Sequence, residues 1–160
     1  MRSRLGIGRA VLVGATAFAL SLGFLAAPAA AAISSMTARL AYSRGFDGRY
    51  TVQVTGLVRM PDTEARNLIA TNHGVVWRLW GEDPISDDLL AGPLTTTTST
   101  FAGVGLRFRG SVVLTGSELN EDAAHAPFDE IDDLYAGVRL VNSRGQTVKS
   151  VESNRVRGRF

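Results

Sequence analysis

The sequence predicts an exported all-β protein, in which a single antiparallel β-sandwich of about seven or eight strands follows a cleaved signal peptide. Three observations support this fold class. Apolar and polar residues alternate with a period of two over most of the chain after residue 35, turn residues separate the alternating segments, and helical periodicity is nearly absent. The chain has no cysteine, so packing must stabilise the domain, alone or with a bound ion. A closed β-barrel is the alternative architecture.

Residues 1–32 have the features of a secretory signal peptide. Arg2, Arg4 and Arg9 precede an uncharged apolar run, which ends in an alanine-rich stretch with an A-x-A site at 30–32. We therefore expect cleavage after Ala32 and a secreted or envelope-associated domain of residues 33–160 without a membrane span. A retained membrane anchor is the alternative, but Pro28 and the lack of a following basic cluster disfavour it.

In the first half we expect strands at 36–42 and 50–58. Gly56 interrupts the alternation in the second of these strands, which indicates a bulge or a close approach of two backbones. Residues 61–70 permit one short helix, because Pro61 is followed by acidic residues in the first turn. The strand at 75–80 has apolar residues on both faces, so we expect it to be central. Trp77 and Trp80 then point to opposite faces, which disfavours a joint aromatic platform for a sugar.

The second half contains three further strong strand signals and one weak one. The threonine-rich segment 94–101 predicts an edge strand or an extended loop. Residues 105–116 predict a strand with a possible kink at Gly110. The last two strands are expected at 134–141 and 146–158, joined by a tight turn at Gly145.

Charge and motifs exclude several function classes. Without the three arginines of the signal peptide, 14 basic residues face 15 acidic ones, so no net positive field would attract nucleic acid. His73 and His125 are the only histidines, and both lie in turn-like sequences. The G-x-S-x-G and H-E-x-x-H motifs are missing, which favours a non-catalytic protein.

Two acidic segments form the candidate site. The first follows the strand at 75–80, and the second, residues 118–133, carries seven acidic residues and no lysine or arginine. Carboxylates at this density repel one another unless water or a shared cation separates them, and Ca²⁺ accepts six to eight oxygen ligands in irregular loops. The candidate calcium ligands are Glu82, Asp83, Asp87, Asp88, Glu121, Asp122, Asp129 and Asp132. Neither segment has EF-hand spacing, and the alternative is solvated loops balanced by the arginine-rich segment 139–159.

The string VWRLWGEDPISDDLL, residues 76–90, resembles the segment V-K-L-W-D-E-D…D-D-L-L of the secreted transthyretin-like proteins. The resemblance implies a small exported sandwich with the first acidic segment in a loop just outside a sheet, whereas the strand pattern itself fits an immunoglobulin-like or a transthyretin-like sandwich. The family's later Ile-Asp-Pro and His-x-Cys features are missing here. The resemblance therefore implies architecture and assigns no functional residue.

Together these observations predict a non-catalytic binding or envelope-associated protein. Its acidic loops would bind a cation, Ca²⁺ being the natural candidate, or a basic partner, either a protein or an envelope polymer. The alternative is a carboxylate-based glycan hydrolase, which requires two carboxyl groups about 5–9 Å apart in a pocket.

Overall fold

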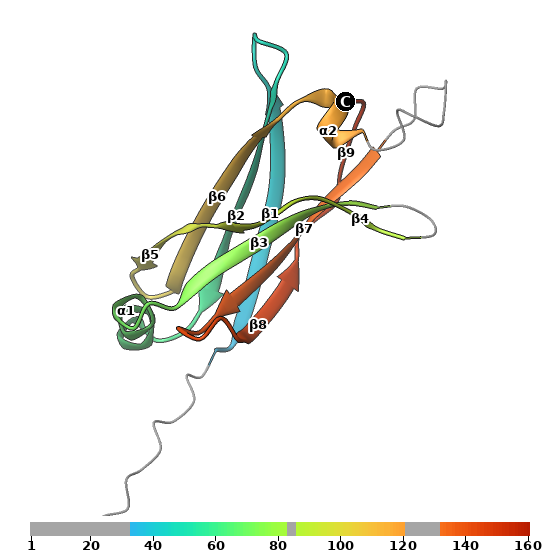
Figure 1. The fold of residues 1–160 in the computed structure, drawn as a ribbon. Coiled ribbons are helices and arrows are strands. Elements are labelled where there is room, and N and C mark those ends of the chain that lie inside the picture. The colour runs from blue at the N-terminus through green and yellow to red at the C-terminus, as the bar shows by residue number, and fades with distance from the viewer. Residues whose placement is uncertain (1–32, 83–85, 121–131) are drawn as a thin grey trace, which may run out of the picture.

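The protein forms two antiparallel β-sheets packed face to face (Figure 1). The computed structural model describes residues 33–82, 86–120 and 132–160. Sheet A has the order β1 (Ser35–Arg44), β2 (Tyr50–Arg59), β6 (Gly105–Leu114) and β5 (Thr97–Phe101). Sheet B has the order β4 (Asp88–Thr95), β3 (Gly74–Glu82), β7 (Asp132–Val141) and β8 (Thr147–Glu152), and the short β9 (Val156–Gly158) also pairs with β7. The predicted all-β sandwich is confirmed.

The inner faces of both sheets supply the core, as the alternation predicts. Trp77 and Phe108 are each 1% exposed, whereas Trp80 lies half-buried on the outer face of sheet B. The two tryptophans thus point to opposite sides, and β3 is central, as expected. A Cβ atom at Gly56 would overlap the Phe108 ring and the backbone oxygen of Thr37, so this glycine permits a close approach.

Gly110 has a similar role on β6. The register between β2 and β6 continues through it without a shift, and a Cβ atom there would collide with the indole nitrogen of Trp77. Within the described residues, that buried indole N–H has no hydrogen-bond partner. Gly110 therefore makes room for the largest side chain of the core.

Two short helices complete the described chain. The expected helix is present as α1 (Asp62–Ala70), which begins after Pro61 and buries Ala65 and Leu68. A second helix, α2 (Gly116–Leu119), was not expected. The Glu118 carboxylate accepts hydrogen bonds from the N–H (2.7 Å) and the hydroxyl (2.8 Å) of Thr115, and the backbone bond above all lowers the pKa of Glu118. Among the described residues, no helix is long and apolar enough to cross a membrane.

The C-terminal segment departs from the prediction of one strand over 146–158. The tight turn at Gly145 is present, but the strand is interrupted at 153–155 between β8 and β9. The Ser153 hydroxyl accepts a hydrogen bond from the Ala136 N–H (2.9 Å). The Asn154 side chain accepts from the N–H of Leu40 (3.0 Å) and donates to the Leu40 carbonyl (3.3 Å). Asn154 therefore links sheet B to the edge of sheet A.

At the edge opposite β1, the chain passes directly from one sheet to the other. β4 belongs to sheet B and β5 to sheet A, and only Thr96 separates them. The N–H and the hydroxyl of Thr96 both donate to the Val75 carbonyl, at 3.1 and 2.9 Å. Within the described part of the chain no strand pairing joins the two sheets, which distinguishes this sandwich from the alternative barrel.

Candidate functional site

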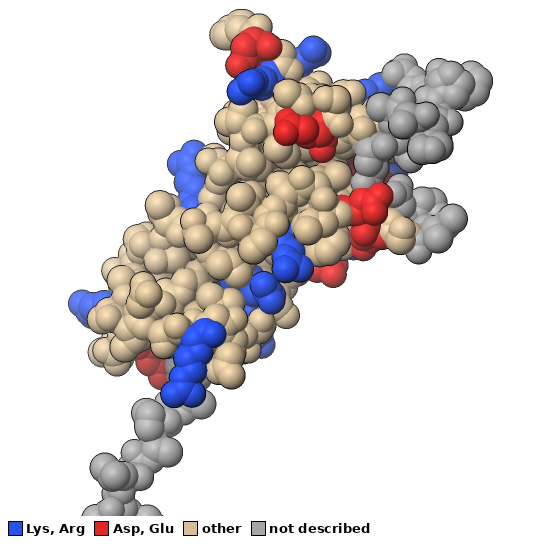
Figure 2. Space-filling model, in the orientation of Figure 1, with Lys and Arg blue, Asp and Glu red and all other residues tan. Residues whose placement is uncertain are grey.

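Both acidic segments reach the same end of sheet B. In the register of β3 and β7, Glu82 pairs with Asp133, and Gly81 pairs with Asp88 at the start of β4. We call this region, where β3 ends and β4 and β7 begin, the acidic end. Figure 2 shows acidic side chains gathered there, while α1 lies at the other end of β3 (Figure 1).

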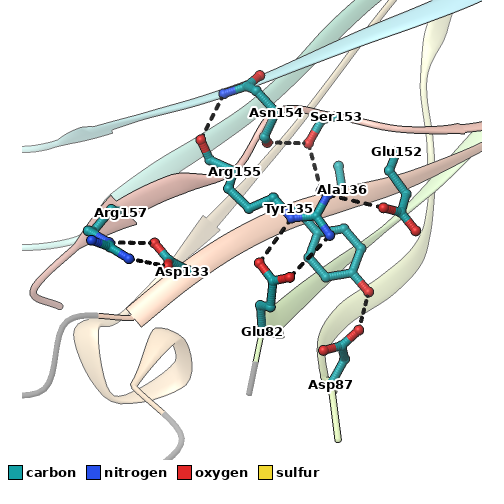
Figure 3. Close-up of polar contacts among 10 residues, drawn as sticks. All are labelled: Glu82, Asp87, Asp133, Tyr135, Ala136, Glu152, Ser153, Asn154, Arg155 and Arg157. Atoms are coloured by element: carbon teal, nitrogen blue, oxygen red, sulfur yellow. Dashed lines mark hydrogen bonds and ion pairs between the residues drawn. The ribbon is translucent and has the colours of Figure 1, made fainter. Parts of the chain in front are cut away.

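Arg155 lies at the centre of the acidic end (Figure 3). Its guanidinium group donates to both carboxylate oxygens of Glu82, at 2.9 and 3.2 Å, and to Glu152 at 3.0 Å. These hydrogen bonds, with Glu82 contributing most, raise the pKa of Arg155. The bidentate geometry fixes the guanidinium plane, which gives such pairs more specificity than a lysine would provide.

Tyr135 lies under this guanidinium group. The Arg155 carbon Cζ is 4.5 Å from the centroid of the Tyr135 ring, and Tyr135, on the outer face of sheet B, is 7% exposed as a residue. The phenol donates a hydrogen bond to Asp87 at 2.6 Å. Burial, together with this bond, raises the pKa of Tyr135 to about 12, so the phenol is a donor and not a base at neutral pH.

A second ion pair joins the start of β7 to β9. Arg157 donates to both carboxylate oxygens of Asp133, at 2.8 and 2.7 Å. These bonds hold the pKa of Asp133 below its usual range. Asp133 is therefore ionised at neutral pH and is bound to a cation that the chain itself supplies.

The structure locates four of the eight candidate calcium ligands. Glu82 is bound to Arg155, Asp87 to Tyr135, Asp88 is exposed at the start of β4, and Asp132 is half-buried at the start of β7. The other four, Asp83, Glu121, Asp122 and Asp129, lie outside the described residues. Among the residues that the structure describes, no three His, Cys, Asp or Glu side chains could hold a metal ion together.

The calcium site thus stays a prediction. For Glu82 and Asp133, the alternative of charge balance by C-terminal arginines describes the observed contacts. Sequence reasoning did not single out Tyr135. Its place on the outer face follows from the alternation in 134–141, but its contact with Asp87 depends on how two distant segments fold together.

Comparison with known proteins adds one structural likeness. No protein-family model and no curated protein matches this chain. A solved structure of a protein from Archaeoglobus fulgidus is similar with a TM-score of 0.38 and 14% sequence identity, over 80% of this chain and 97% of that chain. A likeness at this level carries no argument about function, and the transthyretin-like resemblance stays a prediction.

Proposed function

We propose that this protein is an exported, non-catalytic binding module whose acidic end docks a basic partner. The observation that carries the proposal is the register pair of Glu82 and Asp133, because it brings one end of each acidic segment together. Loops at the end of a rigid sandwich are common sites of recognition.

Net charge at the acidic end favours such a partner. In sequence, residues 82–88 carry four acidic residues and residues 118–133 carry seven, eleven in all. Neither segment contains a lysine or an arginine, and the arginines bound to the described carboxylates are Arg155, at Glu82, and Arg157, at Asp133. Asp87 and Asp88 form no ion pair with the described residues, so the described part of this end keeps an excess of carboxylates. Excess charge of one sign steers an oppositely charged surface into contact and selects against acidic ones.

The state of Asp133 favours binding over hydrolysis. A glycosidase needs one carboxylic acid with a raised pKa to protonate the leaving group. The hydrogen bonds from Arg157 lower the pKa of Asp133 instead. Asp133 therefore stays charged and cannot serve as that acid.

The test is binding of a fluorescent oligolysine peptide, followed by anisotropy at increasing salt. Asp88 is exposed at the acidic end, so Asp88→Asn should weaken binding several-fold, and salt should weaken it further. Asp62→Asn, on α1 at the opposite end, removes the same charge and should leave binding unchanged.

Equal effects of the two substitutions, or no binding at low salt, would contradict the proposal. A calcium arm separates the predicted cation from a basic partner. If the acidic end holds Ca²⁺, adding the ion to chelator-treated protein should raise its melting temperature and compete with the peptide. If it docks only basic partners, millimolar Ca²⁺ should leave the melting temperature unchanged.

A further inference from the structure

The outer face of sheet B carries a shallow groove beside the acidic end. The groove has a volume of about 440 Å³, which lies within the ~300–1,000 Å³ range of small-ligand sites. Arg78 and Trp80 on β3, Gly137 and Arg139 on β7, and Ser150 and Glu152 on β8 line it. The strand register explains why these residues meet, since Arg78 pairs with Gly137, and Gly137 with Glu152. We call this the outer groove.

Gly137 forms the floor of the outer groove. A Cβ atom at this position would lie 3.2 Å from the indole nitrogen of Trp80, so the edge of the Trp80 ring leans over the glycine. Trp80 is half-buried, and its N–H makes no hydrogen bond with the described residues. The Trp80 ring and its available N–H donor thus lie beside the backbone of Gly137, which has no side chain of its own.

The outer groove is lined by two arginines and one glutamate and so has a net positive charge. The Nε atom of Arg78 is buried and, within the described residues, has no hydrogen-bond partner. Arg139 has one weak contact, to the Thr147 hydroxyl at 3.5 Å. The Glu152 carboxylate accepts from Arg155 and cannot neutralise both arginines. A ligand cannot reach the buried Nε atom of Arg78, but the terminal nitrogens of that side chain make no hydrogen bond with the described residues and are available to an anionic ligand.

These donors and this ring match one ligand chemistry. A guanidinium group binds carboxylate and phosphate oxygens in a fixed fork geometry, and an amphipathic aromatic ring packs against the apolar face of a small ligand. We propose that the outer groove binds an acidic saccharide. Its oxyanion bonds to Arg78 and Arg139, and its sugar ring packs against Trp80.

The outer groove adjoins the proposed docking surface, because Glu152 lines the groove and bonds to Arg155 of the acidic end, but the groove carries the opposite charge. A wall or capsule glycan held there would anchor the protein at the envelope and leave the acidic end accessible. The two proposals also fail separately, because Asp88→Asn tests one and does not touch the residues of the other.

The test is an NMR titration of the ¹⁵N-labelled protein with D-glucuronate. The chain has two tryptophans, so its spectrum has two indole N–H signals, and a Trp80→Phe variant assigns them. Saturable binding should shift the Trp80 signal and the amide signal of Gly137, and should leave the Trp77 signal of the core in place.

Matched variants locate the anion. Arg78→Ala should weaken binding at least tenfold. Arg39→Ala is the control, because it removes the same charge from the outer face of sheet A and should change nothing. Gly137→Ala should weaken binding several-fold, since the added methyl group would fill the floor of the groove.

Further ligands separate the sources of the oxyanion. If glucose 6-phosphate binds and glucuronate does not, the proposal holds and the natural ligand is a phosphorylated glycan. If only glucuronate binds, the natural ligand is a carboxylated glycan. Neutral glucose should bind much more weakly than either. If acetate or inorganic phosphate alone caused equal shifts, the proposal that the ligand is a saccharide would be wrong. If neither acidic sugar caused a saturable shift of the Trp80 signal, the proposal that the outer groove is a binding site would be wrong.

Discussion

The two faces of β3 are occupied by side chains with different tasks. On the inner face Val75, Trp77 and Leu79 are at most 1% exposed, and packing against sheet A accounts for each of them. On the outer face Glu82 is bound to Arg155, whereas Arg78, four residues earlier, has no ion pair with the described residues. The inner face therefore serves the fold. The outer face also carries charge that the fold does not use, and binding is best sought there.

The largest expected difference between the faces is that between the two tryptophans. Trp77→Ala should lower the free energy of unfolding by about 3–5 kcal/mol, because it opens a cavity in the core, and Trp80→Ala by less than about 1 kcal/mol. Urea denaturation of both variants measures this. Trp77→Phe keeps a ring and removes the unpartnered indole N–H, so it should cost clearly less than alanine. If Trp77→Ala and Trp80→Ala lost similar amounts of unfolding free energy, the assignment of the inner face to the core and of the outer face to other roles would be wrong.

High pH should expose the role of the buried phenol on the outer face. The pKa of Tyr135 is about 12 in the folded protein, against about 10 in an unfolded chain. Because the folded state holds the proton more tightly, this contribution to stability is complete below about pH 10 and is lost as pH rises toward about 12. The wild type should lose about 1–2 kcal/mol more over this range than Tyr135→Phe. Parallel stability curves would show that Tyr135 titrates normally.

Two arginines on the same face should differ in their effect on stability. Arg155→Ala removes the contacts with Glu82 and Glu152 and uncovers Tyr135, so it should cost about 1 kcal/mol. Arg78→Ala removes no ion pair with the described residues and should stay within about 0.5 kcal/mol of the wild type. Thermal unfolding at low and high salt measures both. A larger loss for Arg78→Ala would assign that residue to the fold and weaken the case for the outer groove.

The smallest effect is expected at acid pH. The folded-state pKa of Asp133 is depressed below its usual value of about 3.8, so its contribution to stability is present above that pH and is lost as pH falls through the folded-state value. Arg157→Ala removes the cause of the depression and should make the acid-side decline of the melting temperature shallower. Superimposable acid profiles would show that the pair is too solvated to matter.

Much of the fold could be predicted from the sequence, because each long strand has one face against the core. This alternation placed Trp77 inside and Trp80 outside correctly. It failed at 153–155, where Ser153 and Asn154 bond to backbone atoms of other strands. Alternation along one strand carries no information about such distant partners. Helix α2 was missed although Thr115 and Glu118 have the spacing of a capping box, which a sequence search can recognise.

The candidate site was predictable only in composition. Two acidic segments and an arginine-rich C-terminal segment are visible in the sequence, but their meeting depends on the register that pairs Glu82 with Asp133. To predict the outer groove, one must know two strand registers, that of β3 with β7 and that of β7 with β8, since Arg78, Gly137 and Glu152 come from three strands. A one-residue slip of β7 would turn Gly137 into the core and leave no groove floor.

The hydrogen bonds between Asn154 and Leu40 have a consequence for how molecules of this protein meet one another. An exposed edge strand is a template on which another chain can add a strand, and long edges of this kind promote aggregation. The Asn154 amide occupies both backbone groups of Leu40 in the middle of β1. A second molecule would have to displace this side chain before it could continue the sheet. One amide thus blocks the backbone positions through which another chain would pair with the middle of β1.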